Sequence, residues 1–284
     1  MSVNIGRRGL LLGACSALCR PLRAAEPGLD HIEWVLTEGD PTTQQILAPQ
    51  MPDVPFTIRH ANIKRIWKEL LSGAPVCSSA LYYRREYAAS TYFTPTFVSA
   101  PPVVAVWPET VSSVPGSTRG VAQLPLLMHS GLKGAAISGR NYGDVVNAMI
   151  ARRPGDSSLT LLESSGSSAR GIEMLVQRRV EYLIVFASEF EEPNAPRQAR
   201  VDRPRLLPIE GAEVMVRAGV VCPRTPWGLM AMRRLDAVLS TPTSVAQLRL
   251  AQDELLVPSD RKRYAAQVQD FFKARAHPMM QTVE

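Results

Sequence analysis

The fold is decided by residues 75–95, PVCSSALYYRREYAASTYFTP. Val76–Leu81 is short, small and apolar, which is typical of a buried strand in an α/β sheet. The six residues that follow, Tyr82–Tyr87, contain two arginines, three tyrosines and a glutamate. Ligands of open α/β sheets bind outside the carboxyl ends of the strands, so this segment carries anion-pairing and ring-stacking groups where such a sheet binds a ligand.

Strand and helix patterns alternate on both sides of this segment. Further strands are expected at Ile32–Thr37, Phe56–Ala61, Pro101–Trp107, Ala135–Ser138, Ser158–Leu162, Tyr182–Phe186 and Glu213–Val221. Helices are expected from Thr42 or Thr43 to Leu47, from Ile63 to Gly73 after an Asn62 cap, and at Asp144–Arg152, Ala169–Arg179, Trp227–Leu239, Ser244–Leu255 and Ser259–Arg275. Residues 191–205 are polar with three prolines and are expected to form a loop. The alternation predicts mostly parallel sheets with helices on both faces.

The positive charge of the chain is concentrated at its start. The 284 residues carry a formal charge of +6, and Arg7, Arg8, Arg20 and Arg23 lie in the first 25 residues, which contain no acidic residue. Without these four arginines the formal charge is +2, so no basic stripe suggests a nucleic-acid partner. The basic start, the apolar run 9–18 and Ala24-Ala25 predict a cleaved signal peptide at residues 1–25. The export route, Sec or twin-arginine, stays open, and the expected location is the periplasm.

Motifs of enzymes and metal sites are missing from the sequence. It contains no G-x-x-x-x-G-K, H-E-x-x-H or G-x-S-x-G. The histidines, His31, His60, His129 and His277, are scattered without metal-ligand spacing. We therefore predict a non-enzymatic protein without metal or cofactor.

Four segments carry a resemblance to a known family. They are VCSSALYYRREYAASTYFTP (76–95), ISGRNYGDVV (137–146), IEMLVQRRVEYLIVFASE (172–189) and VVCPRTPWG (220–228). In this order and spacing the chain resembles the type II periplasmic solute-binding proteins, in particular the family 3 amino-acid-binding components of ABC transporters. The resemblance implies an α/β fold of two lobes, each a mostly parallel sheet flanked by helices, joined by two crossing strands.

The resemblance also implies boundaries and a covalent link. Lobe 1 would comprise residues 29–105 and 217–284, and lobe 2 residues 106–216. Removal of the signal leaves two cysteines, Cys77 and Cys222, and an even pair in an exported chain indicates a disulfide. In the type II fold the two cysteines would lie on neighbouring strands, within bridging distance. The alternative is two buried free thiols.

The residues that define amino-acid specificity in that family are displaced here. The arginine that holds the α-carboxylate corresponds to Tyr87, and the acid that receives the ammonium corresponds to Phe186. We therefore do not predict a standard amino acid as ligand. The expected ligand-binding residues are Glu38, Asp40, Tyr82, Arg84, Arg85, Arg140, Asn141, Tyr142, Phe186 and Glu189. Rings with a few charged anchors would suit a small organic anion or a cyclic compound.

Two functional hypotheses follow. The first is an exported, monomeric solute-binding protein that closes two lobes on a small anionic or aromatic ligand and passes it to a membrane transporter or reports it to a sensor. The second is a degenerate binding-protein fold that serves as a protein-interaction module of the cell envelope without a small-molecule ligand. An enzyme on the same fold would need a carboxylate in the cleft, from Glu38, Asp40 or Glu189.

Overall fold

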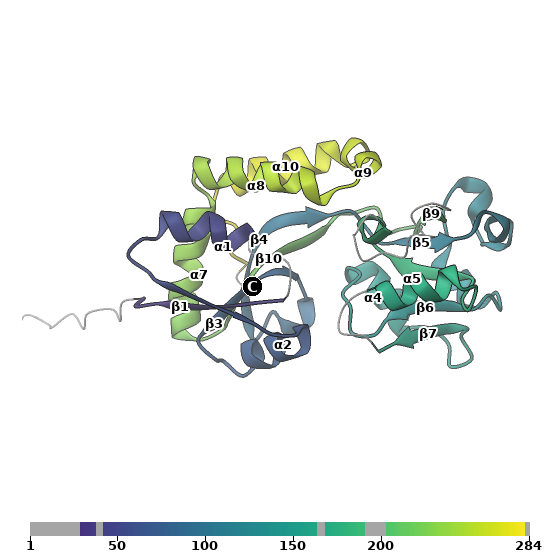
Figure 1. Ribbon diagram of the computed structural model, residues 1–284, viewed down its shortest axis with the longest axis horizontal. Coiled ribbons are helices and arrows are strands. Elements are labelled where there is room, and N and C mark those ends of the chain that lie inside the picture. The colour runs from purple at the N-terminus through teal and green to yellow at the C-terminus, as the bar shows by residue number, and fades with distance from the viewer. Residues whose placement is uncertain (1–28, 38–41, 164–167, 191–202, 282–284) are drawn as a thin grey trace, which may run out of the picture.

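The computed structural model describes residues 29–37, 42–163, 168–190 and 203–281, which form two α/β lobes lying side by side (Figure 1). Two long strands, β4 and β10, run from the first lobe toward the second (Figure 1). The architecture confirms the predicted α/β fold with two sheets and flanking helices. The expected signal peptide lies outside the described residues.

The first lobe is built on a five-stranded sheet in the order β2-β1-β3-β10-β4. Its strands are β1 (Ile32–Leu36), β2 (Phe56–His60), β3 (Val76–Tyr82), β4 (Thr91–Ser99) and β10 (Val216–Pro223). β1 pairs in parallel with β2 and β3, whereas β10 is antiparallel to β3 and β4. Parallel strands that alternate with helices account for the apolar character of 76–81.

The second lobe has its own five-stranded sheet in the order β7-β6-β8-β5-β9. Its strands are β5 (Val103–Val106), β6 (Gly134–Ile137), β7 (Leu159–Leu162), β8 (Tyr182–Val185) and β9 (Arg205–Pro208). β6 is parallel to β7 and β8, and β5 is antiparallel to β8 and β9. The carboxyl ends of β6 and β8 therefore lie at the same edge of this sheet.

Helices cover the sheets of both lobes. The first lobe carries α1 (Thr42–Leu47), α2 (Ile63–Leu71), α7 (Pro226–Leu239), α8 (Pro242–Leu255), α9 (Pro258–Arg263) and α10 (Ala265–Arg275). The second lobe carries α3 (Leu124–Leu127), α4 (Asp144–Ala151) and α5 (Ala169–Val176). Short 3-10 turns are η1 (Ala48–Gln50), η2 (Arg85–Tyr87), η3 (Pro108–Ser113), η4 (Ser117–Arg119) and η5 (Ala187–Phe190).

The two faces of the first sheet bury separate apolar clusters. On one face Trp34 packs with Met232 and Leu235 of α7, all without exposed surface. On the other, Ile66 and Leu70 of α2 are fully buried. The cap of α2 is the expected one, since the Asn62 side chain accepts a hydrogen bond from the Arg65 N–H at 2.9 Å.

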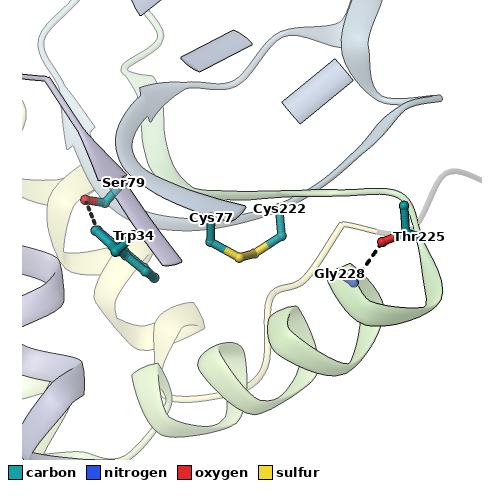
Figure 2. The surroundings of a disulfide bond; sticks show 6 residues. All are labelled: Trp34, Cys77, Ser79, Cys222, Thr225 and Gly228. Carbon is teal, nitrogen blue, oxygen red and sulfur yellow. Dashed lines mark hydrogen bonds between the residues drawn. A yellow bond between two sulfur atoms is a disulfide. The ribbon is translucent and has the colours of Figure 1, made fainter. Parts of the chain in front are cut away.

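The disulfide Cys77–Cys222 joins the adjacent strands β3 and β10, as predicted (Figure 2). Both cysteines are fully buried. Figure 2 also shows the two hydrogen bonds beside it: the Trp34 indole N–H donates to Ser79 Oγ at 3.2 Å, and Thr225 Oγ1 caps α7 by accepting from the Gly228 N–H. The disulfide and the Trp34–Ser79 hydrogen bond stabilise the centre of the first sheet, and the Thr225 cap fixes the start of α7 beside it.

Three local predictions differ from the structure. Residues 101–107 were expected to leave the first lobe, yet β5 pairs entirely within the second sheet, so the chain crosses between the lobes at residues 100–102. Residues 91–99 form the strand β4 although Pro95 interrupts their pattern. β4 lies at the edge of its sheet, and Pro95 pairs with Gly219 at a register shift. Proline is tolerated at such positions because they require no backbone N–H for pairing. The helix expected at 259–275 is divided into α9 and α10 at Tyr264.

Candidate ligand-binding site between the lobes

A stack of aromatic rings connects the two lobes. Tyr82, the last residue of β3, lies against Phe186, which follows β8, with ring centroids 5.3 Å apart and planes inclined by 15°. Tyr142 continues the stack, 5.9 Å from Phe186 at 21°. Phe186 and Tyr142 are each 2% exposed. Both sheets thus contribute rings from the carboxyl ends of their strands to one shared contact.

The conformation of β3 changes just before this contact. Ala80 has φ of 57°, the left-handed region that residues with a Cβ rarely adopt. Opposite it, the pairing of β3 with β10 shifts register between Gly219 and Val221. The irregular backbone re-aims the end of the strand, so that Leu81 packs into the first lobe while Tyr82 packs against the second.

Arg140 and Glu189, both predicted as polar anchors, form an ion pair with each other. Arg140 Nη2 lies 2.5 Å from Glu189 Oε1, and the two side chains are 16% and 6% exposed. Ser168 Oγ accepts from Arg140 at 2.9 Å and donates to Glu189 Oε2 at 2.9 Å. The Phe186 N–H donates to the same carboxylate oxygen at 3.1 Å. The charge of Arg140 is therefore balanced within the second lobe.

The Arg140 guanidinium also packs on the aromatic stack. Its central carbon lies 5.2 Å from the centre of the Phe186 ring, within the range of a cation–π contact. Arg140, held by Glu189, thus contacts Phe186 from within the second lobe, while Tyr82 contacts the same ring from the first lobe. In this geometry the Arg140–Glu189 pair positions the Phe186 ring.

Asn141 and Arg84 make hydrogen bonds from one lobe to the other. Asn141 Nδ2 donates to the Tyr83 carbonyl at 2.6 Å, and its Oδ1 accepts from Asn147 Nδ2 at 2.6 Å. Arg84 Nη2 donates to the Gly139 carbonyl. Both contacts join the segment after β3 to the turn after β6. This turn precedes α4, as the sequence predicted.

The surroundings of Arg84 are less tightly bonded than those of Arg140. Its other terminal nitrogen lies 3.3 Å from the exposed Glu86 carboxylate, and its guanidinium carbon is 5.6 Å from the Trp67 ring centre. Trp67 itself is 8% exposed and packs against Tyr87, with centroids 4.7 Å apart. Tyr87, which we expected at the position of a carboxylate-binding arginine, is partly buried and packs against the first-lobe core.

Exposed ion pairs surround the ring contact. Arg85 Nε lies 3.9 Å from Asp144 Oδ2, and Lys64 Nζ lies 3.3 Å from Glu163 Oε2. Each pair joins the two lobes, and each partner is more than half exposed. Such pairs contribute about 0–1 kcal/mol each, so they direct how the lobes meet more than they stabilise the contact.

Burial changes the acidity of one ring in the stack. It raises the pKa of Tyr142 to about 12, and the hydrogen bond that the Tyr142 hydroxyl accepts from the Ile137 N–H opposes this only in part. The phenol therefore stays protonated at neutral pH and acts as a fixed, uncharged wall.

The structure brings together eight of the ten residues that the sequence analysis assigned to the site. Six lie at or beside the buried contact and Arg85 lies at its exposed edge, while Glu189 acts through Arg140. Glu38 and Asp40 lie outside the described residues. Ser168 was not among these ten residues, because a serine at the start of an expected helix is more readily interpreted as an N-cap than as part of a site. Its hydroxyl makes no cap hydrogen bond and instead bridges Arg140 and Glu189.

Two further searches concern only the part of the chain that the structure describes. Within it, no group of three or more His, Cys, Asp or Glu side chains is arranged to hold a metal ion. No helix in these ranges is long and apolar enough to cross a membrane.

Comparison with known proteins places this geometry in a fold class. No protein-family model matches the chain, and no curated protein matches it. Among solved structures, it is similar to a putative L-cystine ABC transporter from Listeria monocytogenes, with 12% identity, a TM-score of 0.58, and coverage of 81% of this chain and 97% of that chain. The chain has the type II periplasmic binding-protein fold.

Sensor domains share the same fold. A histidine kinase sensor domain with similarity to periplasmic binding proteins matches with 15% identity and a TM-score of 0.57, over 80% of this chain and 96% of that chain. A double mutant of the VFT2 domain of Bordetella pertussis BvgS matches with 12% identity and a TM-score of 0.55, over 80% of this chain and 94% of that chain. At such low sequence identity, the structural similarity shows the fold alone, and the role of the chain has to be argued from its own residues.

Proposed function

We propose that this chain is an exported, monomeric binding protein whose two lobes close on a small cyclic or aromatic ligand that carries an anionic group. The observation that carries the proposal is the Tyr82–Phe186 stack, in which one flat ring from each lobe meets at the carboxyl ends of the strands. A planar ligand that enters as the lobes separate would exchange one ring–ring contact for two. Aromatic stacking of this kind contributes about 0.5–1.5 kcal/mol per pair beyond the buried area.

Arg84 is the anchor that best suits the anionic group. Arg140 is balanced by Glu189 and bridged by Ser168, so turning it toward a ligand would leave a buried carboxylate without its partner. Among its polar contacts, Arg84 gives up a carbonyl of the other lobe and a 3.3 Å contact with exposed Glu86. Lobe separation breaks the carbonyl contact in any case, which leaves the guanidinium fork ready for a carboxylate.

The lobes can move because few segments join them. The chain crosses at residues 100–102 and returns before β10, and lobe closure in two-lobed proteins is absorbed by a few such residues. We keep the proposed signal peptide at residues 1–25, and a periplasmic location agrees with the disulfide Cys77–Cys222. The sequence-based lobe limits, 29–105 with 217–284 and 106–216, shift by a few residues at the first crossing.

A second candidate function is supported by one observation. The lobes already meet through their own side chains, with Arg84 and Asn141 donating directly across the contact. A fold locked in this way would work as an interaction or sensor module without a small ligand. The related architecture serves in sensor domains as well as in transport components.

A thermal-shift screen of the chain from Glu26 onward, in its oxidised form, separates the two functions. Aromatic and alicyclic carboxylates, amino acids and sugars are tested on the native protein and on Arg84→Gln. Arg234→Gln is the matched control, because Arg234 pairs with Asp53 at the surface of the first lobe.

A ligand that binds only the folded state stabilises it by about 2.7 kcal/mol at a hundredfold excess over Kd. We expect an aromatic carboxylate to raise the melting temperature of the native protein and of Arg234→Gln, and to have little effect on Arg84→Gln. If a cooperatively folded sample responds to nothing in a broad library, the interaction module becomes the better account.

A further inference from the structure

A pocket lies at the outer edge of the first sheet, apart from the ring contact between the lobes. It is bordered by β4, by the segment after β3, and by the chain that follows α10, whose Gln281 N–H donates to the Phe93 carbonyl at 2.8 Å. The cavity volume is about 290 Å³. That is close to the lower limit for small-molecule sites in proteins, which run from about 300 to about 1,000 Å³.

One wall of this pocket carries a charged group with unsatisfied donors. Arg224 follows β10 directly, and its backbone N–H donates to the Ser90 carbonyl at 2.8 Å, which fixes its position. Its guanidinium carbon lies 4.5 Å from the centre of the Tyr92 ring. Nε and Nη2 are buried and have no hydrogen-bond partner among the described residues.

Such an arrangement is unfavourable unless something accepts those hydrogen bonds. Burial of a charged donor without an acceptor costs free energy, and an arginine fork pairs best with a carboxylate or phosphate that accepts two parallel bonds. Stacking on Tyr92 holds the plane of the guanidinium and so limits the orientations that an acceptor can take. Both features are those of a preformed anion site.

The remaining walls favour an organic anion over an inorganic one. Tyr83 and Phe93 line the pocket with ring centroids 5.2 Å apart, and Met280 and Ala88 add apolar surface. Thr91 and Gln281 are the other polar residues of the lining. Thr91 already donates its hydroxyl proton to the Tyr87 carbonyl at 2.9 Å, so Arg224 is left as the main partner of a negative charge.

We propose that this pocket is a second ligand site, which binds a small carboxylate with one compact apolar group through Arg224. It belongs wholly to the first lobe, so its occupancy does not require the lobes to close. The site is therefore separate from the one between the lobes, and each can be removed without the other.

Benzoate is the probe that tests this site, and uncharged benzamide of the same shape is its control. Binding is followed on the full exported chain by shifts of backbone amide signals in NMR. The variant Arg224→Met keeps the length of the side chain and removes the fork. Ala88→Leu fills the pocket from another side, and Arg234→Met is the matched control at an exposed ion pair.

We expect benzoate to shift the amide signals around Thr91, Arg224 and Gln281, and benzamide to bind at least about tenfold more weakly. In Arg224→Met and in Ala88→Leu, benzoate binding read from these three signals should weaken by about tenfold or more, while Arg234→Met leaves it unchanged. Equal binding of benzoate and benzamide would overturn the proposal. So would full affinity in a folded Ala88→Leu protein, or shifts confined to the contact between the lobes.

Discussion

Burial of the Tyr142 phenol predicts a loss of stability at alkaline pH. The pKa of Tyr142 is raised to about 12 by burial, against about 10 in an unfolded chain. Because the folded pKa is the higher one, the stabilising contribution is complete below pH 10 and disappears as the pH rises through 12. We expect the free energy of unfolding to fall by about 2–3 kcal/mol over this window from Tyr142 alone.

Urea unfolding from about pH 8 to about pH 12 measures this contribution. Tyr182 has a pKa that burial also raises to about 12, so it adds to the alkaline loss and serves for comparison. Tyr142→Phe and Tyr182→Phe should each make the fall shallower, and the double variant shallower still. A Tyr142→Phe protein that loses stability as steeply as the native one would contradict the assignment.

The Arg140–Glu189 pair predicts strong coupling between two substitutions. Arg140→Gln leaves the Glu189 carboxylate buried with only Ser168 and the Phe186 N–H as donors, and Glu189→Gln leaves the guanidinium without its counter-charge. Each change should cost about 2–4 kcal/mol, somewhat less than for a fully buried pair because Arg140 is partly exposed.

A double-mutant cycle by urea unfolding gives the coupling directly. The double variant should lose at least about 1 kcal/mol less than the sum of the two single losses. Strict additivity would mean that the pair does not act as a unit and that Arg140 is available for a ligand after all.

The sequence predicted residues that lie together in the structure, but not how they pair. Arg140, Phe186 and Glu189 were predicted because each lies at or just beyond the end of an expected strand, and local pattern is enough to find strand ends. The pairing of Glu189 with Arg140 depends on η5, which carries Glu189 directly after β8, and Ser168 joins them from the start of α5. Such contacts arise from packing between elements, which no local pattern encodes.

The disulfide ties β3 to β10 and closes a loop of 145 residues in sequence. In the chain-entropy model a cross-link over so long a loop stabilises the folded state by about 3–5 kcal/mol. We expect Cys77→Ala/Cys222→Ala to lower the free energy of unfolding by this amount, measured in urea against the oxidised protein. An unchanged value would mean that the bridge is dispensable.

Resistance of the native protein to mild reductant is a related expectation. Both sulfur-bearing residues are fully buried, so a thiolate reaches them only when the sheet opens.

Gly219 lies at a close approach of β10 to β4. A Cβ at this position would lie 2.1 Å from the Thr94 carbonyl oxygen and 2.7 Å from Pro95 Cα, both of them backbone atoms that cannot turn aside. Gly219→Ala should therefore destabilise the first lobe by about 2 kcal/mol or more, because two strands have to separate. Gly155→Ala is the control, since a Cβ there meets nothing within 4 Å.

Thermal unfolding of Gly219→Ala and Gly155→Ala, followed by circular dichroism, checks this expectation. A melting temperature for Gly219→Ala equal to that of Gly155→Ala would show that the strands tolerate the added methyl group.

Elements with a clear local signal were predicted well, and those that depend on their neighbours were not. β3, α2 with its Asn62 cap and the Cys77–Cys222 bridge agree with the prediction, because burial pattern, capping chemistry and paired cysteines are readable in sequence. β4 was missed because Pro95 is tolerated only at a sheet edge and a register shift. β9 was missed because the residues near 205 do not alternate between apolar and polar side chains. Their strand conformation is seen only in the pairing with β5.

At the level of the whole molecule the lobes meet as small protein interfaces do. Buried rings from Tyr82, Tyr142 and Phe186 form the centre, and exposed ion pairs such as Arg85–Asp144 and Lys64–Glu163 lie at the margin. The proposed function requires this contact to open for a ligand, so we expect the protein to sample both a closed and an open arrangement.

The most direct test of a ligand site between the lobes is calorimetric titration of the best ligand from the thermal-shift screen into three proteins: native, Tyr82→Ala and Phe186→Ala. The account predicts that each ring variant binds about tenfold or more weakly, since each removes one face of the stack, while Arg224→Met keeps native affinity. Native affinity in both ring variants would contradict a ligand held between Tyr82 and Phe186.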